Sequence, residues 1–495
     1  MKKYNRLVAA VLAGILTIGC MACAGKTTGS TGETQGKSPL DPKDPTTIRI
    51  WNYYNGDQLT AFDELVSEFN STVGMDEGIA VDSVSQGSIE NLADSLLDAA
   101  DEKIGAQDLP TMAAIYAETA YILEQKDLLV NLEDYFTAEE LEKYVPGFIE
   151  EGRMVKEGQL LLFPVSKSTE CFAVNKTGWA DFEAATGITI DSVDSLERLV
   201  DVAGQYYEWS DSLTPDVAED GKALFGWDSV ANYIYIGAAQ LGHELFRVEN
   251  GELMIDLDRT TLKTLWDNYY IPYINGYFQA SASHRSEDMK TGMILAMIAS
   301  TSGISYLPTA VTDADDNSHD IEIEVKKPLK FAKGKEISVQ QGADYCVIKS
   351  SEKEQYAAAE FLKWFTESKR NLQFSVASGY SAVTKEANDA GLIKENFVGT
   401  GDSRKDQNIL NALLISVDVY QNQETYTTAP FKGSKDIRAF LESALQDTAA
   451  RDREAVVQAI GQGVSREEAT AAYSSDAYFD TWFDALCTSV KSMAE

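Results

Sequence analysis

Cysteine and histidine are both scarce in this chain of 495 residues. Two of the five cysteines, Cys20 and Cys23, lie near the N-terminus, and the others are the widely spaced Cys171, Cys346 and Cys487. An odd number of cysteines at wide spacing does not make a disulfide framework, so we expect buried free thiols. The three histidines do not have the spacing of a metal site. We therefore predict no metal and no cofactor.

Positive charge is the next shortage. Lysine and arginine together number 42, against 78 aspartates and glutamates, which gives a net charge of −36 and a pI near 4.4. Binding to nucleic acid or to anionic lipid head groups requires a basic surface. The composition therefore argues against both as partners.

Long apolar runs and catalytic motifs are also lacking. Beyond the N-terminal region, no run approaches the roughly 18 uninterrupted apolar residues that a membrane-spanning helix needs. No glycine-rich phosphate loop of the Walker kind occurs. Cys171 lies in the apolar run 171–174, and no flanking motif supports its use as a nucleophile. We predict that the protein is not an enzyme.

The N-terminus carries the pattern of an export signal. Three basic residues within the first six precede an apolar run over 7–18, which is too short to cross a bilayer. Residues 16–20 resemble a bacterial lipobox, in which a small residue precedes a cysteine that is lipidated and becomes the mature N-terminus. Cys23 is a second candidate that fits this pattern less well. The sequence predicts a signal peptide over 1–19, lipidation at Cys20 and anchoring to the cell membrane outside the cytoplasm.

A polar segment separates this signal from a large body. The segment is rich in glycine, threonine, serine and lysine and has little to bury, so we expect a disordered tether over 20–45. The remaining 450 residues, 46–495, exceed what one hydrophobic core usually holds. We therefore expect two lobes.

The start of the body alternates predicted strands and helices. Strands are expected over 47–51, 79–84 and 112–115, with helices from Asp57 onward and over 89–100. This order predicts a parallel sheet with helices on its faces. Ligands of such sheets bind beyond the carboxyl ends of the strands. The side chains at those ends include Trp51, Tyr53, Tyr54 and Glu118.

Several segments, taken in order, resemble one protein family. They are residues 50–56 followed by a helix, 163–170, 297–303, 341–343 and 377–380. In this order they are similar to the extracellular solute-binding proteins of bacterial ABC importers, in their sugar-binding group, over residues 47–440. Within that group the chain looks most like the glycerol-3-phosphate-binding proteins.

The resemblance implies an α/β fold of the periplasmic-binding-protein kind (type II), with two lobes joined by a hinge. The chain would cross between the lobes near residues 166–169, 339–342 and 377–380. We therefore expect one lobe from 46–168 plus 340–377 and the other from 169–339 plus 378–495. The implied partners are a small solute and the permease subunits of an ABC importer, and we expect the protein to be a monomer.

The aromatic residues favour a sugar as that solute. The flat apolar faces of sugars stack on aromatic rings, while carboxylates, amides and hydroxyls bind the sugar hydroxyls. Candidate contacts at strand ends, loops and the lobe crossing are Trp51, Tyr53, Tyr54, Ser168, Thr169, Trp227 and Tyr380. The resemblance adds Glu118, Ser302, Gly342 and Arg438. We predict that the protein captures a mono- or oligosaccharide.

Arg438 leaves a second class of ligand open. A guanidinium can hold a phosphate through two parallel hydrogen bonds. The alternative ligand is therefore glycerol-3-phosphate or a glycerophosphodiester. One departure weakens this alternative, because Ile89 stands where the resembling proteins have a tyrosine, and isoleucine offers no hydroxyl to a phosphate. Arg438 could also simply pair with one of the many acidic side chains on the surface.

Overall fold

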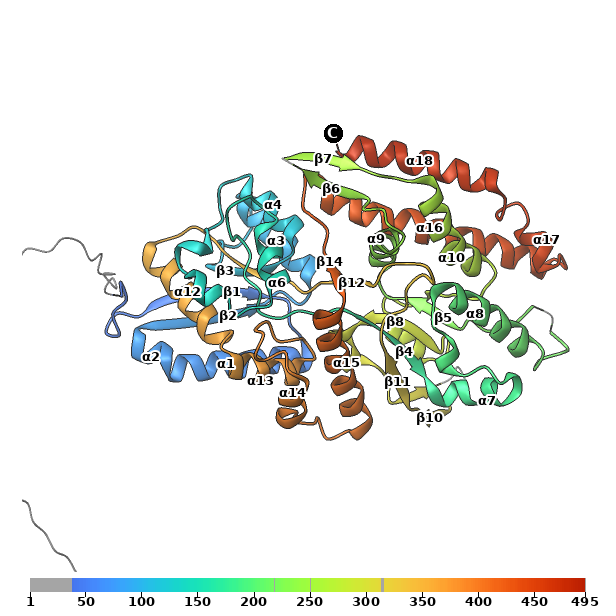
Figure 1. The fold of residues 1–495 in the computed structure, drawn as a ribbon, viewed down its shortest axis with the longest axis horizontal. Coiled ribbons are helices and arrows are strands. Elements are labelled where there is room, and N and C mark those ends of the chain that lie inside the picture. The colour runs from blue at the N-terminus through green and yellow to red at the C-terminus, as the bar shows by residue number, and fades with distance from the viewer. Residues whose placement is uncertain (1–37, 218, 250, 313–315, 495) are drawn as a thin grey trace, which may run out of the picture. The chain divides into compact units, whose positions relative to one another are not determined.

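The computed structural model describes residues 38–217, 219–249, 251–312 and 316–494. The predicted signal peptide, Cys20 and the predicted tether as far as residue 37 lie outside this described part. No helix in the described part is long and apolar enough to cross a membrane. Two four-stranded sheets, one in each of two lobes, organise it (Figure 1).

The first sheet has the strand order β13, β3, β1, β2. Its strands are β1 (Thr46–Asn52), β2 (Ile79–Ser85), β3 (Met112–Ile115) and β13 (Asp344–Val347). β1 runs parallel to β2 and β3, and β13 pairs antiparallel with β3. The parallel sheet expected from the sequence is thus confirmed, and a strand from much later in the chain completes it.

Helices pack against this sheet, with α3 and α4 above it and α1 and α2 below it in Figure 1. The helical elements of the lobe are α1 (Gly56–Ser71), α2 (Val73–Glu77), α3 (Ile89–Ala100), α4 (Ala117–Glu124), η1 (Leu132–Asp134), α5 (Ala138–Leu141), α6 (Pro146–Arg153) and α12 (Glu352–Phe365). In α1, the buried Phe62, Leu65 and Phe69 share one face at helical spacing. They enter the first core, which also contains Trp51 and Phe365.

The second sheet has the strand order β11, β4, β8, β5. Its strands are β4 (Glu170–Asn175), β5 (Phe225–Trp227), β8 (Ala296–Ser300) and β11 (Ile323–Lys326). β4 pairs antiparallel with β8 and β11, and all six of its side chains are buried. The thiol of Cys171 in this strand is free and buried, as is that of Cys346 in the first sheet, which confirms the expectation for both, whereas Cys487 is partly exposed.

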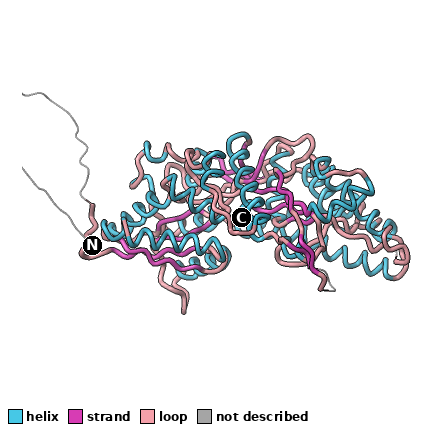
Figure 2. Tube along the Cα trace, turned by 90° about the horizontal axis from the view of Figure 1, so that it is seen from below, coloured by secondary structure: helices cyan, strands magenta, loops and turns pink. Residues whose placement is uncertain are grey.

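Helices surround the second sheet as well, so both lobes combine strands with helices (Figure 2). These helical elements are α7 (Lys176–Thr186), η2 (Ile190–Ser192), α8 (Leu196–Asp211), α9 (Val230–Gln240), α10 (Arg259–Ile274), α11 (Arg285–Lys290) and η3 (Thr301–Tyr306). Two hairpins extend the lobe, β6 (Phe246–Glu249) with β7 (Glu252–Ile255) and β9 (Ala310–Thr312) with β10 (Ser318–Asp320). The second core lies between these helices and the sheet.

The C-terminal part is helical. It contains α13 (Ser368–Ser378), α14 (Ala390–Asn396), α15 (Ser403–Asn422), α16 (Ser434–Gly461), α17 (Arg466–Thr470) and α18 (Asp476–Ala494). Helices α16 and α18 pack on α10 within the second core. Asp452 of α16 ties them together, because its Oδ2 accepts hydrogen bonds from Tyr270 Oη at 2.6 Å and Tyr478 Oη at 2.5 Å.

Two connecting segments, residues 166–169 and 339–342, pair with each other between the two sheets. Ser168 and Gln341 exchange backbone hydrogen bonds of 2.8 and 3.0 Å. Next to this pair, strand β12 (Ile337–Val339) runs parallel to β14 (Glu424–Tyr426). Lys167 is fully buried, and its Nζ lies 2.8 Å from both Glu151 Oε2 and Asp344 Oδ1. Lys167, Glu151 and Asp344 form a buried ion triad, which holds the two connecting segments against the first lobe.

Candidate ligand-binding site

A cleft of about 680 Å³ lies between the lobes. Helices α3 and α4 contribute from the first lobe, α9 and α16 from the second, and the connecting segments form part of its floor. Six residues named from the sequence line this cleft: Glu118, Ser168, Ser302, Gly342, Tyr380 and Arg438. The structure therefore brings together residues that are far apart in the sequence, from Glu118 to Arg438.

The five other residues named from the sequence do not line this cleft, and four of them lie in or next to the buried interior. Trp51 and Tyr54 are fully buried in the first core. Tyr53 is partly buried, with its hydroxyl 3.0 Å from that of Tyr380. Thr169 is fully buried, and its Oγ1 has no hydrogen-bond partner in the described part of the chain. A contact of these four with a ligand stays a prediction.

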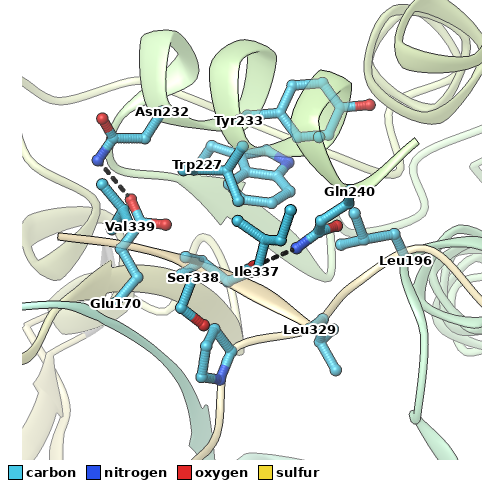
Figure 3. A pocket seen from close by; sticks show the side chains of 14 residues that line it. Glu170, Leu196, Trp227, Asn232, Tyr233, Gln240, Leu329, Ile337, Ser338 and Val339 are labelled. Carbon is cyan, nitrogen blue, oxygen red and sulfur yellow. Dashed lines mark hydrogen bonds between the residues drawn. The ribbon is translucent and has the colours of Figure 1, made fainter. Parts of the chain in front are cut away.

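Trp227 faces a smaller inner cavity of about 20 Å³ (Figure 3). Such a volume holds about one water molecule. Glu170 and Asn232 line both this cavity and the larger cleft, so they form part of the wall between them. Trp227 therefore lies on the far side of that wall, and its role as a ligand contact also stays a prediction.

Several lining residues were not among the expected contacts. They are Tyr116, Glu170, Asn232, Tyr235, Gln341, Tyr426 and Glu442. Tyr116 directly follows β3, so it lies at the same strand end as Glu118, the residue there for which the sequence predicts a ligand contact. Asn232 and Tyr235 belong to α9, in which every residue is buried. A helix that is buried on all sides gives no amphipathic pattern to mark a functional face.

Arg438 lies near the start of α16 and reaches the cleft from the second lobe. Its Nη2 donates a 2.6 Å hydrogen bond to Asn232 Oδ1, and its Cζ lies 5.7 Å from the centre of the Tyr235 ring. Among the described residues, it takes part in no ion pair within 4.0 Å. A guanidinium has five N–H donors, so most of them are free to bind a ligand.

The cleft as a whole is acidic. Its lining includes six carboxylates, namely Glu90, Glu118, Glu151, Glu170, Asp228 and Glu442, and two cations, Lys435 and Arg438. One cation and one carboxylate are already paired outside the lining, because Lys435 lies 3.2 Å from Asp94 and Glu151 contacts Lys167. The remaining groups leave negative charge in excess, which favours a neutral ligand over an anion.

Glu170 is the most perturbed of these carboxylates. Its pKa is raised to about 7, chiefly by burial and also by the nearby charge of Asp228, while the hydrogen bond from Asn232 and the charge of Arg438 oppose the shift. The side chain is 7% exposed, and its Oε1 accepts a 2.8 Å hydrogen bond from Asn232. Protonation of Glu170 therefore occurs close to neutral pH.

This raised pKa predicts a pH dependence of stability. Between the ordinary glutamate pKa of about 4.5 and about 7, the folded protein binds the proton more tightly than the unfolded chain does, so stability falls as pH rises. We expect Glu170→Gln to remove up to about 3 kcal/mol of this fall, at about 1.4 kcal/mol per pKa unit. Urea unfolding of both proteins at pH 5, 6, 7 and 8 measures it. Parallel curves for the two proteins would contradict the assignment.

Comparisons with known proteins agree with this architecture. The model of a family described as bacterial extracellular solute-binding protein matches residues 64–397. No curated protein matches the chain. Among solved structures, the cyclic alpha-maltosyl-1,6-maltose binding protein from Arthrobacter globiformis is similar at 14% identity with a TM-score of 0.62, over 90% of this chain and 100% of that one.

Two further solved structures are similar over the same share of the chain. UgpB from Mycobacterium tuberculosis, in complex with glycerophosphocholine, has 16% identity and a TM-score of 0.62, over 90% of this chain and 98% of that one. The maltose/maltodextrin-binding domain MalE from Bdellovibrio bacteriovorus, bound to maltotriose, has 13% identity and a TM-score of 0.59, over 90% of this chain and 100% of that one. At these identities the likeness establishes the fold, and the two-lobed α/β fold expected from the sequence is confirmed.

Proposed function

Because the chain belongs to the bacterial extracellular solute-binding proteins, we propose that it captures a carbohydrate between its two lobes and delivers it to the permease of an ABC importer. Proteins of this family bind solutes and are not enzymes. They act outside the cytoplasm. Anchoring through a lipid on Cys20 and action as a monomer are parts of the proposal that rest on the sequence pattern.

The lining of the cleft carries the proposal. Tyrosines 116, 235, 380 and 426 line it together with hydroxyl and amide side chains such as Ser168, Ser302 and Gln341. Aromatic faces can stack on sugar rings, and the polar groups can bind sugar hydroxyls. A volume of about 680 Å³ also falls in the range of roughly 300–1,000 Å³ that is common for small-molecule pockets.

Contacts between the two lobes support closure around a solute. Lys435 of α16 pairs with Asp94 of α3 at 3.2 Å. On another side, Tyr306 Oη donates a 2.9 Å hydrogen bond to Asn55 Oδ1, just before α1. Closure buries the ligand between the lobes, and the closed form is favoured only as far as the ligand binds it better than the open form.

Arg438 favours a second candidate ligand, a glycerophosphodiester. Its unpaired N–H donors could hold the phosphate of a glycerophosphodiester, and UgpB, which has a similar fold, was solved with glycerophosphocholine. The excess of carboxylates in the cleft opposes an anion. We therefore place the carbohydrate first and the glycerophosphodiester second.

A thermal-shift screen of the mature chain tests both candidates. Neutral saccharides, glycerol-3-phosphate and glycerophosphodiesters are added separately, and a ligand at a hundred times its Kd should stabilise the protein by about 2.7 kcal/mol. We expect a higher melting temperature with one or more saccharides. Arg438→Lys should then change the affinity less than about tenfold, because a bidentate contact matters most for an anion.

The other outcomes are equally informative. A shift with phosphates alone, lost by more than about tenfold in Arg438→Lys, would establish the second candidate in place of the first. No shift with either class would contradict both.

A further inference from the structure

Asn232 lies in the first turn of α9 and is 4% exposed. Its side chain contacts three others. The amide nitrogen donates to Glu170 Oε1 at 2.8 Å and to Gln341 Oε1 at 2.9 Å, and the amide oxygen accepts from Arg438 Nη2 at 2.6 Å. Figure 3 shows the bond to Glu170.

The orientation of this amide follows from its partners. A guanidinium donates hydrogen bonds and cannot accept them. The amide oxygen of Asn232 must therefore face Arg438, which turns the NH₂ group toward the two acceptor oxygens of Glu170 and Gln341. Both N–H donors and one oxygen of Asn232 are thus engaged at once, so each contact fixes the other two.

Two of these partners lie in or directly next to the two connecting segments. Glu170 begins β4, two residues after Ser168, and Gln341 is the residue whose backbone pairs with Ser168 at 2.8 and 3.0 Å. The third partner, Arg438, lines the cleft. The side chain of Asn232, in the second lobe, therefore contacts Arg438 on one side and residues of or next to the two connecting segments on the other.

On its other side, the Ser168–Gln341 pair adjoins the first lobe. Lys167 precedes Ser168 and is held by Glu151 and Asp344 of the first lobe, each at 2.8 Å. The Ser168–Gln341 pair thus lies between the ion triad of the first lobe and the Asn232 contacts of the second. A change in the Asn232 contacts acts directly on the backbone where the lobes join.

We propose that Asn232 is a positioning residue that couples Arg438 to the two connecting segments, so that contact of a solute with Arg438 is transmitted to the junction between the lobes. The second half of this proposal rests on the proposed function, because it requires a solute in the cleft. The first half concerns the protein without ligand and can be tested alone.

The ligand-free test is amide hydrogen exchange at Ser168 and Gln341. Asn232→Asp keeps the shape of the side chain and an acceptor for Arg438, but replaces the donors that face Glu170 and Gln341 with a carboxylate oxygen. We expect exchange at both amides to accelerate by at least about tenfold, as loss of a buried donor costs enough for that. The neighbouring pair, Lys167 with Ser381, exchanges backbone hydrogen bonds of 3.0 and 2.7 Å and serves as internal control.

A second substitution distinguishes loss of the Asn232 contacts from general destabilisation of the protein. In the double variant Asn232→Asp with Glu170→Gln, the new amide at position 170 can donate to the new carboxylate at 232. We expect exchange at Ser168 and Gln341 to return to within about threefold of the unchanged protein, since a donor again faces an acceptor. Glu170→Gln alone should leave exchange slow, because its amide oxygen still accepts from Asn232.

Arg438→Met tests the link to the cleft. Without the guanidinium, the Asn232 amide loses the partner that sets its orientation, so exchange at Ser168 and Gln341 should accelerate here too. Unchanged exchange in Asn232→Asp, failure of the double variant to restore it, or no effect of Arg438→Met would each overturn the coupling.

The solute arm uses maltotriose as the probe, with the unchanged protein and the same four variants. Binding by the unchanged protein that weakens at least about tenfold in Asn232→Asp and recovers in the double variant would support transmission from solute to junction. Equal affinity in all variants would overturn transmission. If the unchanged protein binds neither maltotriose nor any solute of the thermal-shift screen, the proposed function fails, while the exchange results still decide whether Asn232 couples Arg438 to the junction.

Discussion

Replacing Lys167 with methionine should lower the free energy of unfolding by about 3–5 kcal/mol, because removal of one partner leaves buried charge uncompensated. The Lys167 ammonium is fully buried and lies 2.8 Å from both Glu151 and Asp344. Burial alone would lower the pKa of Lys167, but the attraction of Asp344 and Glu151 outweighs it and raises that pKa, so the lysine stays charged. Without it, two carboxylates share a dry site.

The effect also reaches the junction between the lobes. Glu151 Oε2 accepts a 2.5 Å hydrogen bond from Gln340, and Lys167 donates at 3.2 Å to the carbonyl oxygen of Gly342. Methionine fills a similar volume but offers neither charge nor donor. We therefore expect the loss to come from electrostatics and hydrogen bonding, with little contribution from a cavity.

Urea unfolding at pH 7 measures this loss, and Lys349→Met is the matched control. Lys349 pairs with Asp127 at 2.5 Å, but the two side chains are 44% and 85% exposed. Exposed pairs contribute about 0–1 kcal/mol, so the control should remain near the stability of the unchanged protein. Similar losses of unfolding free energy in the two variants would show that the buried triad contributes no more to stability than an exposed ion pair.

The first sheet could be predicted from the sequence because its signals are local. Short apolar runs bounded by helix starts predict strands at 47–51, 79–84 and 112–115, and the structure has strands at 46–52, 79–85 and 112–115. The intervening helices require parallel pairing. The fourth strand, β13, pairs with β3 although more than 200 residues separate them. No local sequence pattern predicts such a pairing, since it depends on where the chain re-enters the first lobe after the second lobe.

The cleft could be predicted in part. Ser302 and Arg438 came from the family resemblance and Glu118 from both that resemblance and its place at a strand end, and all three line the cleft. Asn232 and Glu170 could not be found in this way, because their place at the cleft depends on distant contacts. Asn232 bonds to Glu170, 62 positions away, and to Arg438, 206 positions away. A lone asparagine in a buried helix indicates nothing until those partners are in place.

Trp51 lies at the strand end where the sequence predicts a ligand contact, and in the structure its side chain is buried in the first core. The residue lies one position before the end of β1, and β1 has β2 on one side and β3 on the other. Inner strands of parallel sheets are covered by helices on both faces, so consecutive residues can all be buried. Accordingly Ile50, Trp51 and Asn52 are each 0% exposed.

We expect Trp51→Ala to lower the free energy of unfolding by about 3–5 kcal/mol, as is usual when a large aromatic side chain is removed from a core. The indole is fully buried in the first core, and its Nε1 has no hydrogen-bond partner in the described part of the chain. Trp51→Phe should therefore cost less than Trp51→Ala, because it keeps most of the apolar contact and loses no hydrogen bond that holds the core. Urea unfolding of both variants measures the difference.

The affinity of the folded variant separates packing from recognition. Because Trp51 does not line the cleft, the Kd of Trp51→Phe for the solute found in the thermal-shift screen should stay within about tenfold of the unchanged protein. Trp209, which is partly buried in α8, gives a control for loss of a tryptophan far from this core. A loss of affinity beyond tenfold in Trp51→Phe, with stability retained, would instead make Trp51 a ligand contact, as the sequence predicts, and would require β1 to open toward the cleft when the solute binds.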